Sequence, residues 1–273
     1  MLGKLIKYEL ITCGRTFLPI YLAILLMSVI TGFSINMEIF KISGVSMIIL
    51  FGLFVSLVVL TIMIIIQRFR KNLLEDEGYL MFTLPVTSKE LILSKYSVSL
   101  IYIILSSIVS LISFIMIILI SNINNFSLDY FLYDLSILSN ELLSVKSTLI
   151  YTIILIFVRY TIFILSIYLS LSMGQLSIFN KYRNIVAFLS FFIINIVLGK
   201  IYGLLSIGFN FFIGDYFMSN TYINESSSLN VLLSGFNDML SPFLLFNIIV
   251  YIIFSIILFF GINYILDKKL NLE

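Results

Sequence analysis

Long apolar runs separated by polar connections are the main pattern of the chain. Six runs exceed the roughly 18 residues that a helix needs to cross a hydrocarbon core about 30 Å thick. They cover about residues 17–36, 44–66, 97–120, 148–171, 185–207 and 243–265. None alternates apolar and polar positions as a membrane β-strand does. We therefore predict an all-α integral membrane protein with six transmembrane helices in a single domain over residues 1–273, and we find no internal repeat.

Basic residues are distributed unevenly between the connections, and this predicts the orientation of the helices. If the N-terminus is inside, only Lys41 and Lys146 of the 16 Lys and Arg residues lie in outer connections. Two more, Arg159 and Lys200, lie within spans, and the others lie in inner segments. Because Lys and Arg concentrate on the cytoplasmic side of membrane proteins, we predict a multi-pass protein with both termini in the cytoplasm.

The composition agrees with a membrane protein and argues against several kinds of chemistry. The chain is 61% hydrophobic and 11% charged, compared with roughly 45–50% and about 25% in soluble domains. It has no histidine and one cysteine, Cys13, so neither a zinc cluster nor an internal disulfide is expected. Without a histidine base or paired carboxylates in the spans, an enzyme is the weakest hypothesis. We expect no catalysis, no bound metal and no nucleic acid partner.

Residues 1–16 have the pattern of a basic amphipathic helix. Lys4 and Lys7 project to one side of the helix, and leucine and isoleucine residues project to the other. We predict an interfacial helix on the inner membrane surface that forms an elbow before the first span. Glu9 falls in the middle of the apolar face, where a carboxylate without a partner is costly. Either Glu9 reaches water near the helix end, or it pairs with an attached protein or with the helix bundle.

Two outer connections, residues 121–147 and 208–242, are longer than a simple turn requires and mix apolar with polar residues. We expect helices that lie on or dip into the outer surface. Glycines and asparagines in the second connection, such as Gly208 and Asn210, would also suit a broken, re-entrant path.

The cytoplasmic connection over residues 67–96 has strong local signals. We expect the second helix to continue to Glu77 and to end at Gly78, because glycine commonly closes a helix. The acidic run at residues 75–77 opposes the helix dipole, and it is either a contact for a basic partner or a solvated charge run. Thr87 and Glu90 have the spacing of a capping box, which predicts a new helix that begins at Ser88.

Between these two helices lies the apolar sequence GYLMFTLPV, residues 78–86. Burial of one such side chain contributes roughly 1.5–3 kcal/mol, so we expect this segment to be covered. Three coverings are consistent with the residues. They are the lipid interface, the inner ends of the bundle itself and a groove on a separate protein.

Three stretches carry a resemblance to a known family. MLGKLIKYEL, GRTFLPIYLAILL and EDEGYLMFTLPVTSKELILSK resemble the membrane subunits of bacterial ATP-binding-cassette exporters of the type-2 permease class. The rest of the chain matches only in layout. The resemblance implies a protein of the bacterial cell membrane with a connecting helix over Leu2–Gly14, which includes Lys4, Lys7 and Glu9. It also implies a second permease chain, identical or different, and two cytoplasmic ATPase subunits that hold ATP and Mg.

The resemblance implies a coupling helix between spans two and three that docks on the ATPase. Its contact residues would be Glu75, Asp76, Glu77, Gly78, Tyr79, Leu80, Met81, Phe82, Leu84, Pro85, Thr87 and Ser88. The chain itself would hold no cofactor, because it lacks the G-x-x-x-x-G-K-[ST] phosphate loop. The leading hypothesis is therefore a permease subunit that forms half of an exporter pathway. Peptides, antimicrobial compounds and lipids all suit its apolar, aromatic-rich spans.

Two other functions are weighed against this one. The first is a membrane protein of the immunity or sensor type that binds a partner without transporting anything. The second is an ion-driven carrier, which would need a carboxylate at membrane depth, and the six predicted spans contain none.

Two basic residues lie within predicted spans. Lys200 is near enough to the outer face to extend towards water. Arg159 lies close to the middle of the fourth span, where an exposed charge is costly, so we expect it to face the bundle. Its partner is open among backbone carbonyls, Asn195, an anionic substrate group and a residue of a second subunit.

Overall fold

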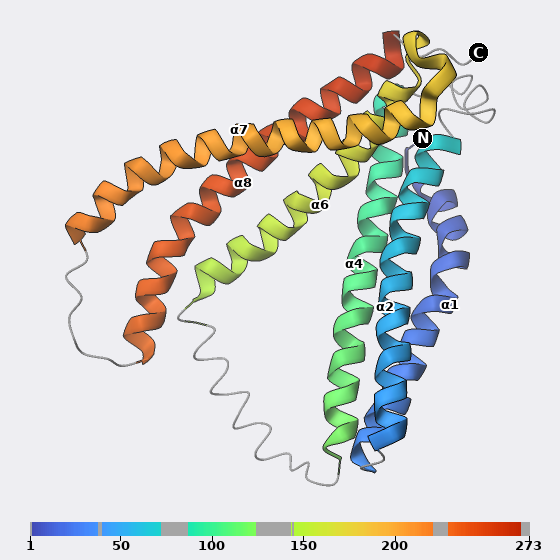
Figure 1. Ribbon diagram of the computed structural model, residues 1–273, viewed down its shortest axis with the longest axis vertical. Helices are drawn as coiled ribbons and strands as arrows, with labels where there is room; N and C mark the ends of the chain where they lie inside the picture. Colours follow the sequence, from blue (N-terminus) through green and yellow to red (C-terminus); the bar gives the residue numbers. More distant parts are fainter. Residues whose placement is uncertain are drawn as a thin grey trace. The chain divides into compact units, whose positions relative to one another are not determined.

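The computed structural model describes residues 2–37, 40–71, 87–123, 143, 145–220 and 229–268, and these residues are mainly helical. The helices are α1 (Leu2–Asn36), α2 (Phe40–Phe69), α4 (Ser88–Ser121), α6 (Lys146–Gly174), the short 3₁₀ helix η2 (Ser177–Tyr182), α7 (Arg183–Asn220) and α8 (Leu229–Lys268), as Figure 1 shows. Six of them are long and apolar enough to cross a membrane. The prediction of six spanning helices is confirmed.

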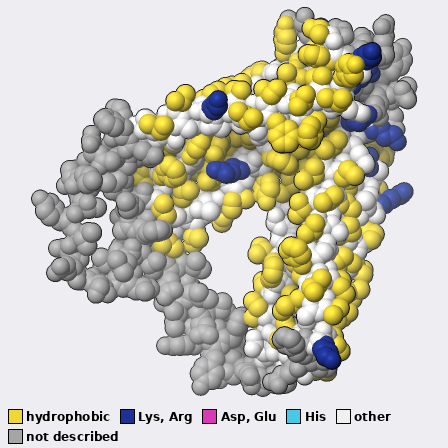
Figure 2. Space-filling model, in the orientation of Figure 1, with side chains coloured by type: hydrophobic (Ala, Val, Ile, Leu, Met, Phe, Trp, Pro, Cys, Tyr) yellow, Lys and Arg dark blue, Asp and Glu magenta, His cyan; other side chains and the backbone are white. Residues whose placement is uncertain are grey.

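Large apolar side chains are exposed along all six helices. Ile48 keeps 73% of its surface exposed and Leu204 keeps 72%. On the face that Figure 2 shows, hydrophobic side chains cover much of the described helices and basic side chains are few. Soluble proteins do not expose such continuous apolar surface. Contact with lipid explains it, because hydrocarbon satisfies apolar side chains while each helix satisfies its own backbone hydrogen bonds. The six apolar helices are therefore compatible with a multi-pass membrane protein.

The chain divides into two compact units, which are essentially Met1–Phe131 and Leu132–Asn271. In the first unit, α1 packs most extensively against α4 and also contacts α2. The buried core consists of apolar side chains from these three helices: Cys13, Phe17, Tyr21, Ile24, Leu57, Val98 and Tyr102. α1 and α4 run parallel to each other, and α2 runs in the opposite direction.

One close approach fixes the distance between α1 and α4. A Cβ atom placed on Gly32 would lie 2.8 Å from the Cβ of Ile120, which is closer than real Cβ contacts allow. One turn further along, the Nδ2 of Asn36 donates to the carbonyl of Ser121 at 3.1 Å. Glycine therefore lets the two backbones meet, and the asparagine satisfies a carbonyl group that the end of α4 leaves without an intrahelical partner.

The second unit contains α6, η2, α7 and α8. α6 and α8 run parallel, because Thr148 contacts Asn237 near their starts and Leu169 contacts Gly261 near their ends. α7 runs in the opposite direction and packs on α6. Where α6 ends, a Cβ atom on Gly174 would lie 2.7 Å from the carbonyl oxygen of Arg183. Glycine at this position therefore lets the end of α6 lie close to the start of α7.

The two units share a layout that the sequence does not reveal. In each, the first and third helices run parallel and pack together most extensively, and the second helix runs in the opposite direction. The second helix makes its larger contact with the first helix and its smaller contact with the third. In its described residues, the chain thus forms two units of three long helices each, although we find no repeat between them in the sequence.

Several predicted boundaries can be compared with the helices. The predicted start of a helix at Ser88 is confirmed, with Thr87 as its N-cap and a complete capping box to Glu90. Residues 1–16 form no separate elbow in the structure, because α1 continues from Leu2 through Pro19 to Asn36 without interruption. The apolar face of residues 1–16 packs on α2 and α4, so this part of α1 belongs to the first unit.

The connections predicted to be outer or cytoplasmic are described only in part. α7 extends to Asn220 and α8 begins at Leu229, so both ends of the predicted outer segment 208–242 are helical. Residues 221–228 and most of the connection 121–147 lie outside the described residues, as do residues 72–86 of the predicted coupling segment. Directly after α2, Arg70 and Lys71 form a π-helical turn that leads into this segment.

Candidate functional site

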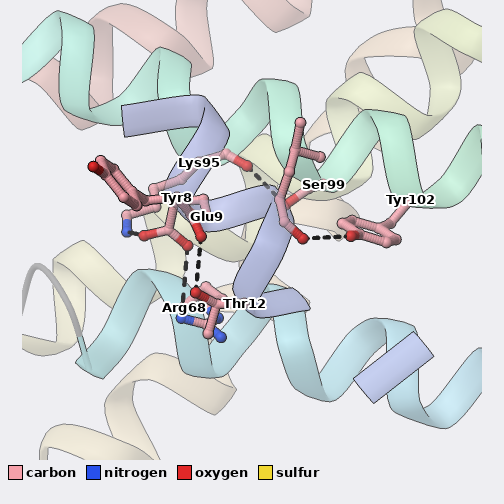
Figure 3. Close-up of polar contacts among 8 residues, drawn as sticks. Tyr8, Glu9, Thr12, Arg68, Lys95, Ser99 and Tyr102 are labelled. Atoms are coloured by element: carbon pink, nitrogen blue, oxygen red, sulfur yellow. Dashed lines mark hydrogen bonds and ion pairs between the residues drawn. The ribbon is translucent and has the colours of Figure 1, made fainter. Parts of the chain in front are cut away.

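Glu9 lies at the centre of a buried ionic cluster in the first unit. Its residue is 8% exposed. Oε1 accepts from the Nζ of Lys95 in α4, and Oε2 lies 3.7 Å from Nη1 of Arg68 in α2. Figure 3 shows the carboxylate of Glu9 next to both basic side chains. Of the two interpretations left open by the sequence, pairing with the bundle is therefore the correct one.

The burial of this cluster determines how its charges affect the stability of the fold. Lys95 is 3% exposed, and the side chain of Arg68 is 28% exposed. Removal of charges from water is expensive, and the attraction between them offsets that cost only when the geometry is good. Once the cluster is assembled, loss of one partner leaves a buried charge uncompensated, which is strongly destabilising. The cluster therefore fixes how the three helices fit together.

The residues around the cluster hold its backbone in place. The hydroxyl of Tyr102 donates to the carbonyl of Leu10 at 2.6 Å, and its ring stacks on Phe17 with centroids 4.5 Å apart. The hydroxyl of Ser99 donates to the carbonyl of Lys95 at 2.9 Å. The Tyr102 contacts join α1 to α4 near Glu9, and the Ser99 bond lies within α4 (Figure 3).

The cluster lies at both ends of the predicted coupling segment. Arg68 is in the last turn of α2, before residues 72–86, and Lys95 is in the second turn of α4, after them. Glu9 thus connects α1 to the two helices that carry this segment. Of the predicted docking residues, Thr87 and Ser88 are described, at the start of α4. The others, Glu75 to Pro85, lie outside the described residues. Lys4 and Lys7 are exposed on α1, away from the cluster.

A second polar group includes Arg159, an exposed residue of α6 in the second unit. Its Nη2 donates to the hydroxyl of Tyr251 in α8 at 2.9 Å, and its Cζ lies 5.0 Å from the centroid of the same ring. Tyr251 stacks on Tyr202 of α7 with centroids 5.3 Å apart. The hydroxyl of Tyr202 donates to Oδ1 of Asn247 at 2.5 Å. Side chains of all three helices thus meet at Arg159.

Arg159, Tyr202 and Tyr251 line a hollow of about 230 Å³ between α6, α7 and α8. Asn195, one of the partners considered for Arg159, also lines it. Its Nδ2 donates to the carbonyl of Phe191 in its own helix at 2.7 Å, and the hydrogen bond of Arg159 goes to Tyr251 instead. The partner in the structure is Tyr251, which the sequence did not indicate.

The residues that sequence reasoning missed share a weak signal. Lys95 lies in the apolar stretch LILSKYSVSL, and Asn247 lies in the apolar stretch SPFLLFNIIV. A lysine or asparagine among mainly apolar residues and serines indicates a polar partner, but the pattern does not say which partner. Among the described residues, no three His, Cys, Asp or Glu side chains come together in a group that could hold a metal ion. The two polar groups therefore offer charge and hydrogen bonds as their chemistry.

Comparison with protein-family models, with curated proteins and with solved structures finds no match to this chain.

Proposed function

We propose that this chain is the permease subunit of an ATP-driven exporter of the bacterial cell membrane. It forms half of the translocation pathway and docks a separate cytoplasmic ATPase through residues 75–88. The six apolar helices support a membrane-spanning role, and the resemblance of residues 75–95 supports the transporter class. Transport by this chain with a second permease chain, identical or different, is part of the proposal.

The observation that carries the proposal is the position of the Glu9 cluster. A coupling segment is useful only if a push on it moves the spanning helices. Glu9 binds the last turn of α2 and the second turn of α4, which are the two stems of the segment. Because buried ion pairs break only at high cost, α1, α2 and α4 would respond to the segment as one body.

The proposed mechanism uses residues of this chain only to receive and transmit a movement. ATP and Mg act in the partner subunit, where binding and hydrolysis change the position of the docking groove. The capping box at Thr87 stabilises the first turn of α4, and α4 continues without interruption to Ser121. Displacement of the segment would therefore reach the far end of α4 as a rigid-body motion.

The experiment is affinity purification of the tagged full chain from the membranes of its native cells in mild detergent. We expect an ATPase with a phosphate-loop sequence to copurify. Phe82→Ala and Leu84→Ala should each lower its recovery about tenfold or more, as loss of an apolar anchor at an interface does. Phe126→Ala and Leu128→Ala make the same chemical changes in the outer connection and should leave recovery unchanged.

Two results would contradict the proposal in different ways. If Phe82→Ala and Leu84→Ala insert normally and retain the ATPase, residues 75–88 are not the docking segment. If the wild-type chain purifies without any ATPase and the native membranes show no ATP-dependent export that requires it, the chain is not an exporter subunit. An interaction protein of the immunity or sensor type would then be the better proposal.

A further inference from the structure

Arg159 holds a positive charge near the middle of an apolar helix. It lies 13 residues after the first residue of α6 and 15 residues before the last. Its guanidinium group has five N–H donors, and the hydroxyl of Tyr251 accepts from one nitrogen. Both this hydroxyl and the ring beneath the guanidinium are neutral, so the charge of Arg159 is stabilised but not balanced.

The described part of the second unit offers no carboxylate to balance this charge. Its only described carboxylate side chain is that of Asp267, which accepts from Nδ2 of Asn263 at 2.9 Å. Asp267 follows Tyr251 by 16 residues on α8, or about 24 Å along the helix axis. An uncompensated charge at this depth is costly. A counter-charge from outside the described unit would remove that cost.

The hollow next to Arg159 has space for a negatively charged group, and its apolar lining suits an apolar tail attached to that group. Arg159, Asn195 and Tyr202 form its polar part. Phe163, Leu198 and Phe254 form its apolar part. Its volume of about 230 Å³ is many times the roughly 10–15 Å³ that one water molecule needs on the same measure. A site with one fixed cation, few polar groups and apolar walls suits an amphipathic acid.

We propose that this hollow binds the acidic group of an amphiphile, a phosphate or carboxylate on an apolar tail, with Arg159 as its counter-ion. The acidic group accepts from the guanidinium N–H groups that point away from Tyr251, and the tail lies along Phe163, Leu198 and Phe254. The ligand is either a membrane phospholipid or an exported amphiphile with the same chemistry. Its assignment as cargo rests on the proposed transport function, whereas its binding does not.

The test measures binding of radiolabelled dodecyl phosphate to the purified full chain in phosphatidylcholine nanodiscs, without any ATPase. Arg159→Gln should weaken binding about tenfold or more, the scale of a lost charge-assisted hydrogen bond. Arg159→Lys keeps the charge and should recover part of the affinity. Lys200→Gln removes a charge from α7 at a residue that does not line the hollow, and it should change affinity by less than about twofold.

A second variant tests the hollow without changing its charge. Leu198→Trp fills the apolar part and should abolish dodecyl phosphate binding while Arg159 stays in place. Competition identifies the source of the ligand. Displacement by phosphatidylglycerol indicates a lipid site, and displacement only by single-chain acids indicates a cargo site.

The outcomes that overturn the proposal are specific. If Arg159→Gln and Leu198→Trp both bind as wild type does, the hollow is not the site. If Lys200→Gln weakens binding as much as Arg159→Gln, the effect is general surface charge. If Arg159→Gln instead dissociates a dimer of the chain and leaves binding unchanged, the counter-charge comes from a second copy. Each result is independent of the ATPase docking test, so failure of one proposal is distinguishable from failure of the other.

Discussion

The carboxylate of Glu9 in α1 accepts from the ammonium group of Lys95 in α4, 86 residues further along the chain. Arg68, at the end of α2, lies 3.7 Å from the other oxygen of the same carboxylate. One acidic side chain thus holds two basic ones, each from a different helix. Because one carboxylate faces two basic groups, substitutions of the acidic and the basic residues should differ in how much they destabilise the chain.

Glu9→Gln should destabilise the chain more than Lys95→Met. The first change leaves Lys95 charged and buried next to Arg68, and loss of one partner from a buried pair costs about 3–5 kcal/mol. The second change leaves Glu9 beside Arg68, so a counter-charge remains. Thermal unfolding of the full chain in detergent measures both. Arg68→Gln is the matched control, because Arg68 is the most exposed of the three side chains and should cost least.

A double change tests whether the cluster acts through its charges. Glu9→Leu combined with Lys95→Met removes both ions of the pair and should be milder than Glu9→Gln alone. Equal costs for Glu9→Gln, Lys95→Met and the combined variant would mean that packing, and not charge, explains the effect.

The start of α4 shows which features the sequence could predict. Thr87 and Glu90 are three residues apart, and their two reciprocal hydrogen bonds depend only on the local backbone. The six helices were likewise predictable, because each is a continuous apolar run long enough to cross a membrane. Such features need no knowledge of distant residues.

The partners of charged side chains within the spans depend on distant residues and were not predictable in the same way. Arg159 meets Tyr251 at a separation of 92 residues, and Tyr251 is one of several aromatic residues in its span. The amphipathic pattern of residues 1–16 was recognisable, but membrane surface and helix bundle satisfy an apolar face equally well. In the structure, α2 and α4 cover it, so the expected elbow is absent and α1 is continuous.

Gly32 is expected to tolerate no larger side chain. Its Cβ position would lie 2.8 Å from the Cβ of Ile120, and neither atom can move without shifting a helix. Gly32→Val should therefore destabilise the first unit by about 1–3 kcal/mol, as overpacking does. Gly52→Ala is the control, because nothing lies within 4 Å of its Cβ position. That change should be neutral or stabilising by up to about 1 kcal/mol in the helix interior. Unfolding of both variants in the same detergent provides the comparison.

Asn237 is expected to stabilise the start of α6 from a distant helix. Its Oδ1 accepts from the backbone N–H of Thr148 at 3.1 Å and from the hydroxyl of Thr148 at 2.7 Å. The N-cap residue Val145 has no side-chain oxygen to do this. Asn237→Ala should cost about 0.5–2 kcal/mol, the range for loss of an N-cap acceptor. Asn237→Asp keeps the acceptor and should retain most of the stability. Hydrogen exchange at the first turn of α6 would locate the effect, and unchanged protection there in Asn237→Ala would contradict it.

Tyr251 is expected to act on Arg159 through both its hydroxyl and its ring. Tyr251→Phe removes the acceptor at 2.9 Å but keeps the ring under the guanidinium and against Tyr202. It should cost about 1.5–3 kcal/mol if the hydrogen bond to a charged group is fully lost, and less if a ligand or water replaces the hydroxyl. Tyr251→Leu removes the ring as well and should cost at least about 0.5–1 kcal/mol more. Dodecyl phosphate distinguishes the two alternatives for Tyr251→Phe. If the acidic group binds the guanidinium of Arg159, saturating dodecyl phosphate should restore most of the melting temperature that Tyr251→Phe loses. No recovery would mean that Tyr251 stabilises Arg159 without any ligand nearby.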